Sequence, residues 1–249
     1  MPGQGAEGLE GKAYFLSDLH LGAYPDAEKT SVPMLIRFLD HVAATGGRLF
    51  IVGDLLDFWF EYPRVVPRYP FKLLAQLKCM VDRGSSIVYI AGNHDYWMGD
   101  FLRNEVGVQT VLDVLDVTLG DKRFFISHGD GIAITGQLSY RMLKRFLHSR
   151  AVSFGFRLLH PDIGLRLAGA VSKFSRRRSS RNNHDPRLEV FVKHKAEEGF
   201  DCVVLGHLHK PQIFDVGKVS CLVVGDWIDS FTYGLFDDGK LTLEHWPIG

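Results

Sequence analysis

Five short segments of the chain combine histidine, aspartate and asparagine side chains in a way that suits metal chemistry. The first holds Asp18 and His20, two residues apart, and four more follow along the chain. The candidate ligands are Asp18, His20, Asp54, Asn93, His128, His207 and His209. Imidazole, carboxylate and amide oxygen together suit a divalent ion such as Mn²⁺, Fe²⁺ or Zn²⁺. No cysteine belongs to the set, which argues against a structural zinc site.

This set of ligands is larger than one ion needs. We therefore expect two divalent ions that share a bridging carboxylate, with Mn²⁺ as the expected metal. Two ions about 3.5–4 Å apart clamp the attacking and leaving oxygens of a phosphoryl transfer. A single aspartate after an apolar run is more often only a turn residue, but five such segments favour a shared site. The set predicts a metal-dependent hydrolase of phosphate compounds.

Each segment follows a short apolar run that predicts a buried β-strand. The runs are residues 13–16, 49–52, 87–90, 123–126 and 202–205. Ligand sites of open α/β sheets lie at the carboxyl ends of the strands. Gly53 lets the chain turn sharply and brings the backbone close to whatever Asp54 binds.

The chain between these runs predicts an α/β fold. Apolar residues at helical spacing over 30–44 and 71–82 give the order strand, helix, strand, helix, which indicates a parallel βαβ core. A short helix near 101–105, a strand over 108–118 and a helix over 188–198 follow. Strands are expected over 219–224, 231–236 and 241–246, with turns at 215–217 and 237–239.

Length and composition set broad limits. The 249 residues suffice for one large domain, expected over 12–249 after a glycine-rich flexible tail at 1–11 that lacks the apolar core of a signal peptide. A hydrophobic content of 46% and a charged content of 23% are typical of a soluble globular protein. No apolar run reaches membrane-spanning length. The three cysteines are unpaired in spacing, which fits a reducing cytosol.

The five segments, in this order, resemble the signature of calcineurin-like metallophosphoesterases. They read Ser-Asp-Leu-His from 17, Gly-Asp-Leu-Leu-Asp from 53, Gly-Asn-His-Asp from 92, Ser-His-Gly-Asp from 127 and Gly-His-Leu-His from 206. The resemblance implies a two-sheet αββα sandwich with a helical cap inserted at about 136–182. It also implies that Asp54 bridges two ions. One ion would be held by Asp18, His20, Asp54 and His209, and the other by Asp54, Asn93, His128 and His207.

The same resemblance gives roles to residues beside the ligands. It implies that His94 lies over the substrate phosphate, as an acid for the leaving group or as a stabiliser of the transition state. It implies that Asp95 orients His94. Asp57 and Asp130 either support the ligands or are ordinary structural residues. Expected contacts with the substrate include Asn93, His94 and His207.

Three longer stretches, over 53–62, 92–98 and 225–233, resemble UDP-2,3-diacylglucosamine diphosphatases. Those enzymes cleave the pyrophosphate of a diacylated UDP-sugar in lipid A biosynthesis, giving UMP and 2,3-diacylglucosamine 1-phosphate. The resemblance implies this activity, an acylated UDP-sugar as substrate, and a cytoplasmic protein that is peripheral on the inner membrane. The best-known branch has arginine at the position of His94, so the chain resembles a His-bearing branch.

The insertion at 136–182 has an unusual charge. The whole chain has a formal net charge of zero, but between Gln137 and Arg187 there are 12 Lys and Arg against 2 acidic residues. The insertion is either a packed helical element with a solvated basic face, or a lid that holds acyl chains and contacts an anionic membrane. Pro161 is expected to divide it into at least two helices. Arg177 and Arg181 are candidates to pair with the pyrophosphate.

Two other interpretations remain open. The first is a metallophosphoesterase that acts on a nucleotide, a nucleic acid or a phosphoprotein. The acidic remainder of the chain and the apolar insertion weigh against a nucleic acid. The second is a non-catalytic scaffold with the same fold, and the intact ligands in all five segments weigh against it. The sequence indicates no oligomeric state.

Overall fold

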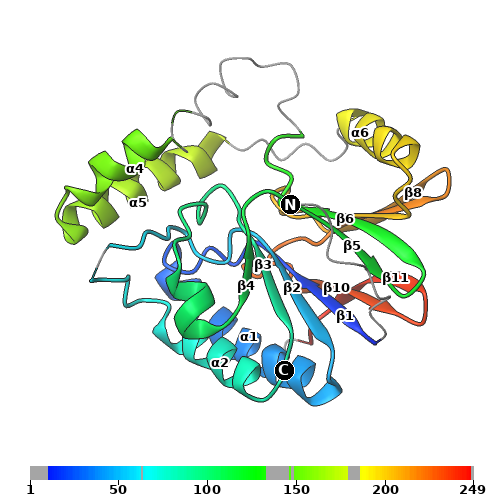
Figure 1. Ribbon diagram of the computed structural model, residues 1–249, viewed down its shortest axis with the longest axis horizontal. Coiled ribbons are helices and arrows are strands. Elements are labelled where there is room, and N and C mark those ends of the chain that lie inside the picture. Colours follow the sequence, from blue (N-terminus) through cyan, green and yellow to red (C-terminus); the bar gives the residue numbers. More distant parts are fainter. Residues whose placement is uncertain (1–10, 63, 133–145, 147–148, 179–185, 248–249) are drawn as a thin grey trace.

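Two β-sheets packed face to face, with helices on both outer sides, make up the body of the protein (Figure 1). The computed structural model describes residues 11–62, 64–132, 146, 149–178 and 186–247. The expected two-sheet α/β sandwich is confirmed.

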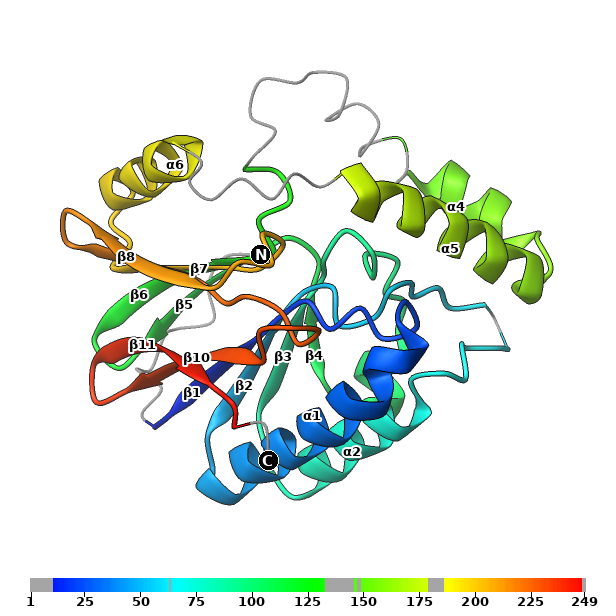
Figure 2. The same ribbon diagram turned by 180° about the vertical axis from the view of Figure 1, so that it is seen from behind.

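The first sheet has six strands in the order β11-β10-β1-β2-β3-β4. Strands β1 to β4 are parallel, and β10 and β11 extend the sheet antiparallel. The bounds are β1 Ala13–Leu16, β2 Arg48–Val52, β3 Ile87–Ile90, β4 Gln109–Val111, β10 Thr232–Asp237 and β11 Lys240–His245. Helices α1 (Pro25–Thr45) and α2 (Phe71–Asp82) cover its outer face (Figure 2).

The second sheet has five strands in the order β5-β6-β7-β9-β8. Strands β6, β7 and β9 are parallel, with β5 and β8 antiparallel at the edges. The bounds are β5 Val114–Leu119, β6 Lys122–Ser127, β7 Cys202–Leu205, β8 Gln212–Val216 and β9 Val219–Val223. Helix α6 (Pro186–Glu197) packs on the outer face of this sheet.

The layers follow from the alternation of side chains along each strand. In β1, Tyr14 and Leu16 join the core beneath α1 and α2, whereas Phe15 joins the core between the sheets. Phe15 stacks on Phe50 of its own sheet and on Phe124 of the other, with ring centroids 5.3 and 5.9 Å apart. Because both faces are buried, these strands have almost continuous apolar sequences.

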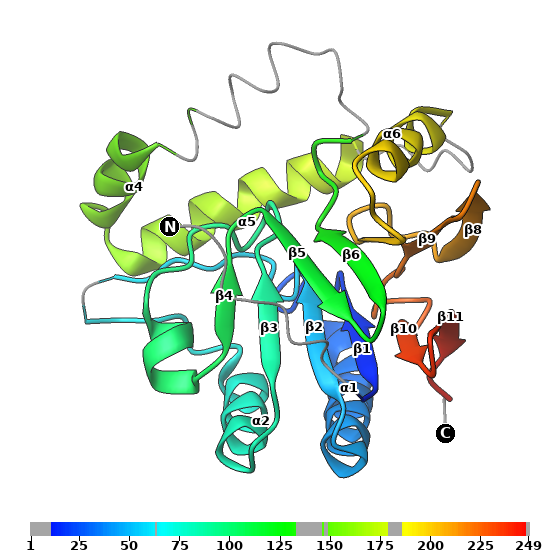
Figure 3. The same cartoon turned by 45° about the vertical axis from the view of Figure 1, so that its right-hand side comes forward.

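Two helices of the insertion, α4 (Arg150–Arg157) and α5 (Pro161–Arg178), lie outside the sandwich. Helix α5 passes over the carboxyl ends of the parallel strands of the first sheet (Figure 3). Pro161 begins α5, so the expected break between helices is present. The other parts of the expected cap, 136–145, 147–148 and 179–182, lie outside the described residues, as do residues 1–10 of the expected tail. None of the helices that the structure describes combines the length and apolar character of a membrane span.

Several element boundaries differ from the sequence expectation. Helix α1 begins at Pro25, and the expected helix near 101–105 is a π-helix, η1 (Leu102–Val106). The single strand expected over 108–118 is two strands, β4 and β5, that belong to different sheets. Strand β8 was not expected, and it occupies part of the turn assigned to 215–217.

Candidate metal centre and active site

The candidate ligands extend from the carboxyl ends of five parallel strands. Asp18 and His20 follow β1, Asp54 follows β2, and Asn93 follows β3 in the first sheet. The second sheet supplies residues after β6 and β7, namely His128, His207 and His209. The two sheets therefore bring all seven residues to one end of the sandwich.

The backbone at this end has an uncommon conformation. Among the described residues, seven non-glycine residues have a positive φ, and five of them carry candidate ligands. These five are Asp18, His20, Asp54, His207 and His209. Hydrogen bonds from the amides of Asp18 and His20 to the carbonyls of Gly53 and Asp54, at 3.2 and 2.9 Å, help to hold this conformation.

Position 53 has no space for a side chain, because two neighbouring residues lie too close to it. Its φ is +81°, and a Cβ there would meet the ring of His128 at 2.5 Å and the backbone of Gly92 at 2.7 Å. Only glycine therefore lets the loop after β2 approach those after β3 and β6. This close approach places Asp54 between the two sheets.

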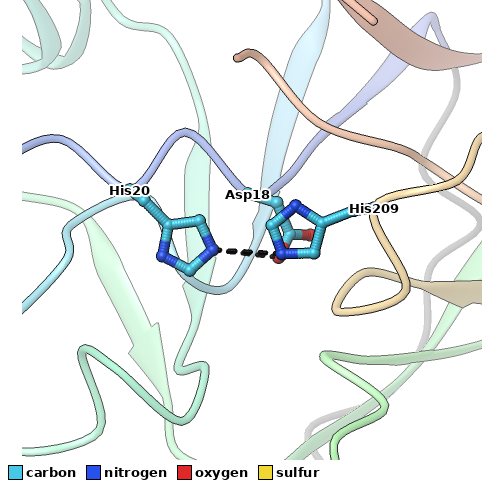
Figure 4. A group of neighbouring side chains, drawn as sticks. All are labelled: Asp18, His20 and His209. Atoms are coloured by element: carbon cyan, nitrogen blue, oxygen red, sulfur yellow. Dashed lines mark hydrogen bonds and ion pairs between the residues drawn. The ribbon is translucent and has the colours of Figure 1, made fainter. Parts of the chain in front are cut away.

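Asp18, His20 and His209 form the first group of donors (Figure 4). The two histidine Nε2 atoms lie 3.3 Å apart, and Asp18 Oδ1 lies 3.7 Å from His20 Nε2 and 3.5 Å from His209 Nε2. Ligands of one ion, with bonds of about 2.0–2.2 Å, are separated by similar distances. The three donors therefore fit a single divalent ion.

The carboxylate of Asp18 supports this fit. Its Oδ2 accepts a hydrogen bond of 2.9 Å from the amide of His207 and lies 2.5 Å from Ser17 Oγ. Its Oδ1 is buried and has no hydrogen-bond partner among the described residues. An ionised oxygen that is buried without a donor is costly, so it needs a cation beside it.

Asp54, His128 and His207 form the second group of donors. Asp54 Oδ2 lies 3.1 Å from His128 Nε2 and 3.7 Å from His20 Nε2 of the first group. Asn93 Oδ1 lies 3.3 Å from His128 Nε2. The structure thus places Asp54 between the two groups, where a bridging ligand would have to lie.

The ring of His128 is held from its far side. Its Nδ1 lies 2.9 Å from the carbonyl oxygen of Val52. Because a carbonyl oxygen only accepts, Nδ1 must donate its proton there, so Nε2, which faces Asp54, is the nitrogen that binds a metal once its own proton is lost. Neutral imidazole in this tautomer is the form that binds a metal.

The charges of the site strongly perturb its pKa values. Burial raises the pKa of Asp18, but His209 and His20 outweigh burial and hold the pKa at about 2. Burial lowers the pKa of His128, but Asp54 outweighs it and raises the pKa well above its ordinary value. Burial and the neighbouring His128 lower the pKa of His207 to about 4. The charges therefore favour a proton on His128 and disfavour one on His207.

His94 lies beside the two groups, close to Asp57. Its Nδ1 is 3.0 Å from the backbone oxygen of Asp57 and 3.4 Å from Oδ1 of the same residue. Its Nε2 lies 4.0 Å from Asp54 Oδ2. Burial lowers the pKa of His94, but Asp54 and Asp57 outweigh burial and raise it to about 9. The imidazole is therefore protonated at neutral pH and can donate a hydrogen bond or a proton.

Asp57 also contacts a candidate ligand. Its Oδ1 lies 3.8 Å from His20 Nδ1, and His20, Asp57 and His94 form a third group of donors. One buried carboxylate thus lies between a candidate metal ligand and the candidate catalytic histidine.

Asp95 contacts other groups than those expected. Its carboxylate accepts hydrogen bonds from the Tyr89 hydroxyl at 2.5 Å, the Gly92 amide at 2.7 Å and the Leu56 amide at 3.4 Å. It therefore holds the loop that carries Asn93 and His94 against β3. Asp57, and not Asp95, makes the contact with His94 that was expected to orient its ring.

Other predicted residues have less defined places. Asp130 is buried, and its charge favours the protonated form of His128 and partly opposes the lowered pKa of His207. Arg177 belongs to α5, but its side chain is not described, and Arg181 lies outside the described residues. Both arginines stay predictions.

The sequence did not single out Asp226, which also contacts this centre. Its Oδ2 lies 3.7 Å from His209 Nδ1. Asp226 belongs to the stretch over 225–233, whose resemblance to the diphosphatases is the one sign of its importance in the sequence. The distance to His209 could not be derived from it.

The cap packs on the loops that follow the site. Phe156 of α4 contacts the rings of Phe58, Phe60 and Trp97, with centroids 5.5, 4.7 and 5.3 Å apart. Phe58 directly follows Asp57, and Trp97 lies shortly after His94. An aromatic surface thus adjoins the centre on the side of the cap.

The chain is similar to several known proteins. The sequence model described as calcineurin-like phosphoesterase matches residues 11–211. A protein of Porphyromonas gingivalis named UDP-2,3-diacylglucosamine hydrolase is 29% identical, with 95% of this chain and 98% of that protein covered. A Haemophilus influenzae protein of the same name is 26% identical, with 86% and 90% covered. A solved structure described as a novel archaeal phosphodiesterase has 15% identity and a TM-score of 0.48, with 94% and 99% covered.

Proposed function

The chain belongs to the calcineurin-like phosphoesterase family, and from this membership we propose that it hydrolyses the pyrophosphate of UDP-2,3-diacylglucosamine. It is a metal-dependent hydrolase of phosphoric anhydrides or esters. The proposed products are UMP and 2,3-diacylglucosamine 1-phosphate, as in lipid A biosynthesis. The observation that carries the proposal is the pair of His and Asp groups that meet at Asp54, with His94 beside them.

Two divalent ions fit the donors. Asp18, His20 and His209 would hold one ion, and Asn93, His128 and His207 the other, with Asp54 common to both. Divalent ions in such a site act as Lewis acids toward phosphoryl oxygens and lower the pKa of water. We propose Mn²⁺ for both positions, because carboxylate, amide and imidazole ligands suit it.

His94 would act on the substrate rather than on the ions. Hydrolysis adds water across one P–O bond of the pyrophosphate and releases two phosphate monoesters. When protonated, His94 can donate to a phosphoryl oxygen as negative charge develops there, and the carboxylate of Asp57, 3.4 Å from its Nδ1, favours the protonated form. His94 can also give its proton to the leaving oxygen. Asp57 holds the ring in place through Nδ1, and Nε2 is the nitrogen that would make this donation.

The cap supports an acylated substrate. Phe156 packs on aromatic residues next to the site, while other apolar side chains of α4 and α5 are exposed. Phe154, Leu158, Ile163 and Leu167 are 51–74% exposed. Each methylene that is buried against such a surface contributes about 0.8 kcal/mol. The names of the two bacterial relatives support the same substrate.

The exposed apolar residues and the basic composition of the insertion also support binding to an anionic membrane. We therefore propose a cytoplasmic protein that is peripheral on the inner membrane.

The proposal is tested by hydrolysis assays with Mn²⁺ present. The diacylated UDP-sugar is expected to be cleaved with a higher kcat/KM than the unacylated UDP-sugar or simple phosphodiesters. The His94→Ala variant is the matched control for contaminating phosphatases. Equal cleavage of acylated and unacylated substrates would contradict the proposed lipid substrate, but the proposed phosphoesterase activity would still stand. Loss of all hydrolysis, with bound metal, would favour the non-catalytic scaffold.

A further inference from the structure

The loop between β9 and β10, residues 224–231, crosses from the second sheet to the first beside the metal centre. The amide of Trp227 donates to the backbone oxygen of Asp18 at 3.2 Å. The Trp227 ring is fully buried, and its Nε1 donates to the backbone oxygen of Thr232 at 2.7 Å. The hydroxyl of Thr232 donates to Val224 at 2.7 Å. The amide of Val224 donates to the backbone oxygen of Leu205 in β7 at 2.9 Å, so these contacts fix the loop to both sheets.

Asp226 is held within this loop by three backbone amides. Its Oδ1 accepts from Ile228, Asp229 and Ser230 at 3.1, 2.9 and 3.0 Å. The preceding Gly225 has a φ of +88°, and a Cβ there would clash with Thr232 and Pro211. The carboxylate of Asp226 therefore has little freedom to move.

The other oxygen of this carboxylate faces a candidate metal ligand. Asp226 Oδ2 lies 3.7 Å from His209 Nδ1, within ion-pair distance. An ionised carboxylate only accepts, so this contact favours a proton on Nδ1. Nε2 is then the metal-binding nitrogen, and it faces Asp18 and His20.

His209 needs this support more than other ligands do. Its side chain is 34% exposed, whereas those of Asp18 and His20 are almost fully buried. His128 has the carbonyl of Val52 behind its ring, and Asp226 is the corresponding group behind His209. Partners of this kind fix the tautomer and the direction of a metal-binding imidazole.

We propose that Asp226 is a positioning residue that sets the tautomer and direction of His209, and with them the affinity of the ion held by Asp18, His20 and His209. This inference rests on the proposed two-metal centre. It concerns one of the two ions, because no contact of Asp226 with Asn93, His128 or His207 is found among the described residues.

The experiment compares the full-length protein with its Asp226→Asn variant. The amide oxygen of asparagine can still accept from the loop amides, whereas its NH₂ group cannot accept from His209 Nδ1. Asp229→Asn is the matched control, since Asp229 is an exposed carboxylate in the same loop. Stepwise Mn²⁺ dissociation constants are measured by equilibrium dialysis. ¹⁵N NMR of the metal-free protein, at a pH high enough for the His209 ring to be neutral, reports the tautomer of that ring.

The expected result is that Asp226→Asn lowers the binding affinity for one of the two Mn²⁺ ions by about 10–100-fold and leaves the affinity for the other unchanged. Asp229→Asn is expected to bind both ions as the wild type does. Thermal unfolding of metal-free Asp226→Asn should match that of the wild type.

Two results would overturn the inference. The first is wild-type affinity for both ions in Asp226→Asn. The second is an equal loss of affinity for both ions together with a lower melting temperature. That result would mean that Asp226 has only a structural role. A wild-type protein that binds no Mn²⁺ would instead refute the proposed function itself.

Discussion

At the scale of single residues, the central position belongs to Asp54. Its carboxylate faces both groups of donors, whereas Asp18 belongs to one. Asp54→Ala should therefore lose more activity than Asp18→Ala. The loss of several kcal/mol of transition-state stabilisation corresponds to a fall of about 100-fold or more in kcat/KM. Assays of both variants with Mn²⁺, alongside circular dichroism to verify folding, check this, and full activity in Asp54→Ala would refute it.

His94 is expected to matter for chemistry and not for metal binding. His94→Ala should lower kcat by about 10²–10⁴-fold, the range for a general acid. Its Mn²⁺ content should match that of the wild type, because the ring contacts Asp57 rather than completing either group of assigned ligands. Metal analysis of the purified variant provides the control. Normal kcat with depleted metal would mean that His94 is a ligand.

Protons and metal ions are expected to compete for the centre. Burial lowers the pKa of His128 and His209, but Asp54 and Asp18, respectively, outweigh burial and raise it. Without metal these rings therefore bind protons more readily than an ordinary histidine does, and a metal ligand must lose its proton. Mn²⁺ binding should therefore release protons, and its affinity should increase as the pH rises above the ordinary histidine pKa of about 6.5. Titration calorimetry in buffers of different ionisation enthalpy measures the release, and zero release would contradict the prediction.

At the scale of elements, α4 is expected to select the acylated substrate. Phe156→Ala removes a ring that packs on Phe58, Phe60 and Trp97, and it should raise KM for the diacylated UDP-sugar by about 10-fold, or roughly 1.4 kcal/mol. Cleavage of the unacylated UDP-sugar should change little. Phe71→Ala on α2, where the ring is 72% exposed and outside the cap, is the control. An equal loss for both substrates would indicate a role in packing alone.

The strands that position the site could be predicted because they are short, apolar and buried on both faces. The start of helix α1 was predicted too late. Its first turn, with Asp26 and Glu28, lacks the apolar residues at helical spacing on which the prediction was based. Apolar and polar residues alternate throughout the stretch over 108–118. This alternation predicts a strand, but it does not indicate which sheet the strand joins or where one strand ends and the next begins. Strand β8 was missed because it is a half-exposed edge strand that follows Pro211.

The candidate ligands could be predicted because each directly follows its strand. The partners of those ligands depend on contacts between distant loops. Asp57 contacts His94 although the two residues are 37 positions apart in the sequence. Asp226 reaches His209 only because the loop after β9 returns across the end of the sandwich. Spacing along the chain carries no record of such contacts.

At the scale of the whole molecule, charge is separated between the insertion and the body. The 12 basic and 2 acidic residues between Gln137 and Arg187 lie in a chain of zero net charge. The protein should co-sediment with anionic vesicles and much less with neutral ones. Binding should weaken between 0.1 M and 1 M salt, where the screening length falls from about 10 Å to about 3 Å. Equal binding to both kinds of vesicle would show that charge plays no part.

The left-handed backbone at five ligand-bearing residues has a consequence for how such a protein can evolve. Each of these conformations costs a non-glycine residue about 1–2 kcal/mol, in a fold whose net stability is typically about 5–15 kcal/mol. Glycine would adopt the same conformations without that cost, but it provides no ligand. Selection for catalysis therefore retains residues that selection for stability alone would replace. A descendant released from catalysis would gain stability by losing its site, so inactive relatives of this fold should be easy to reach.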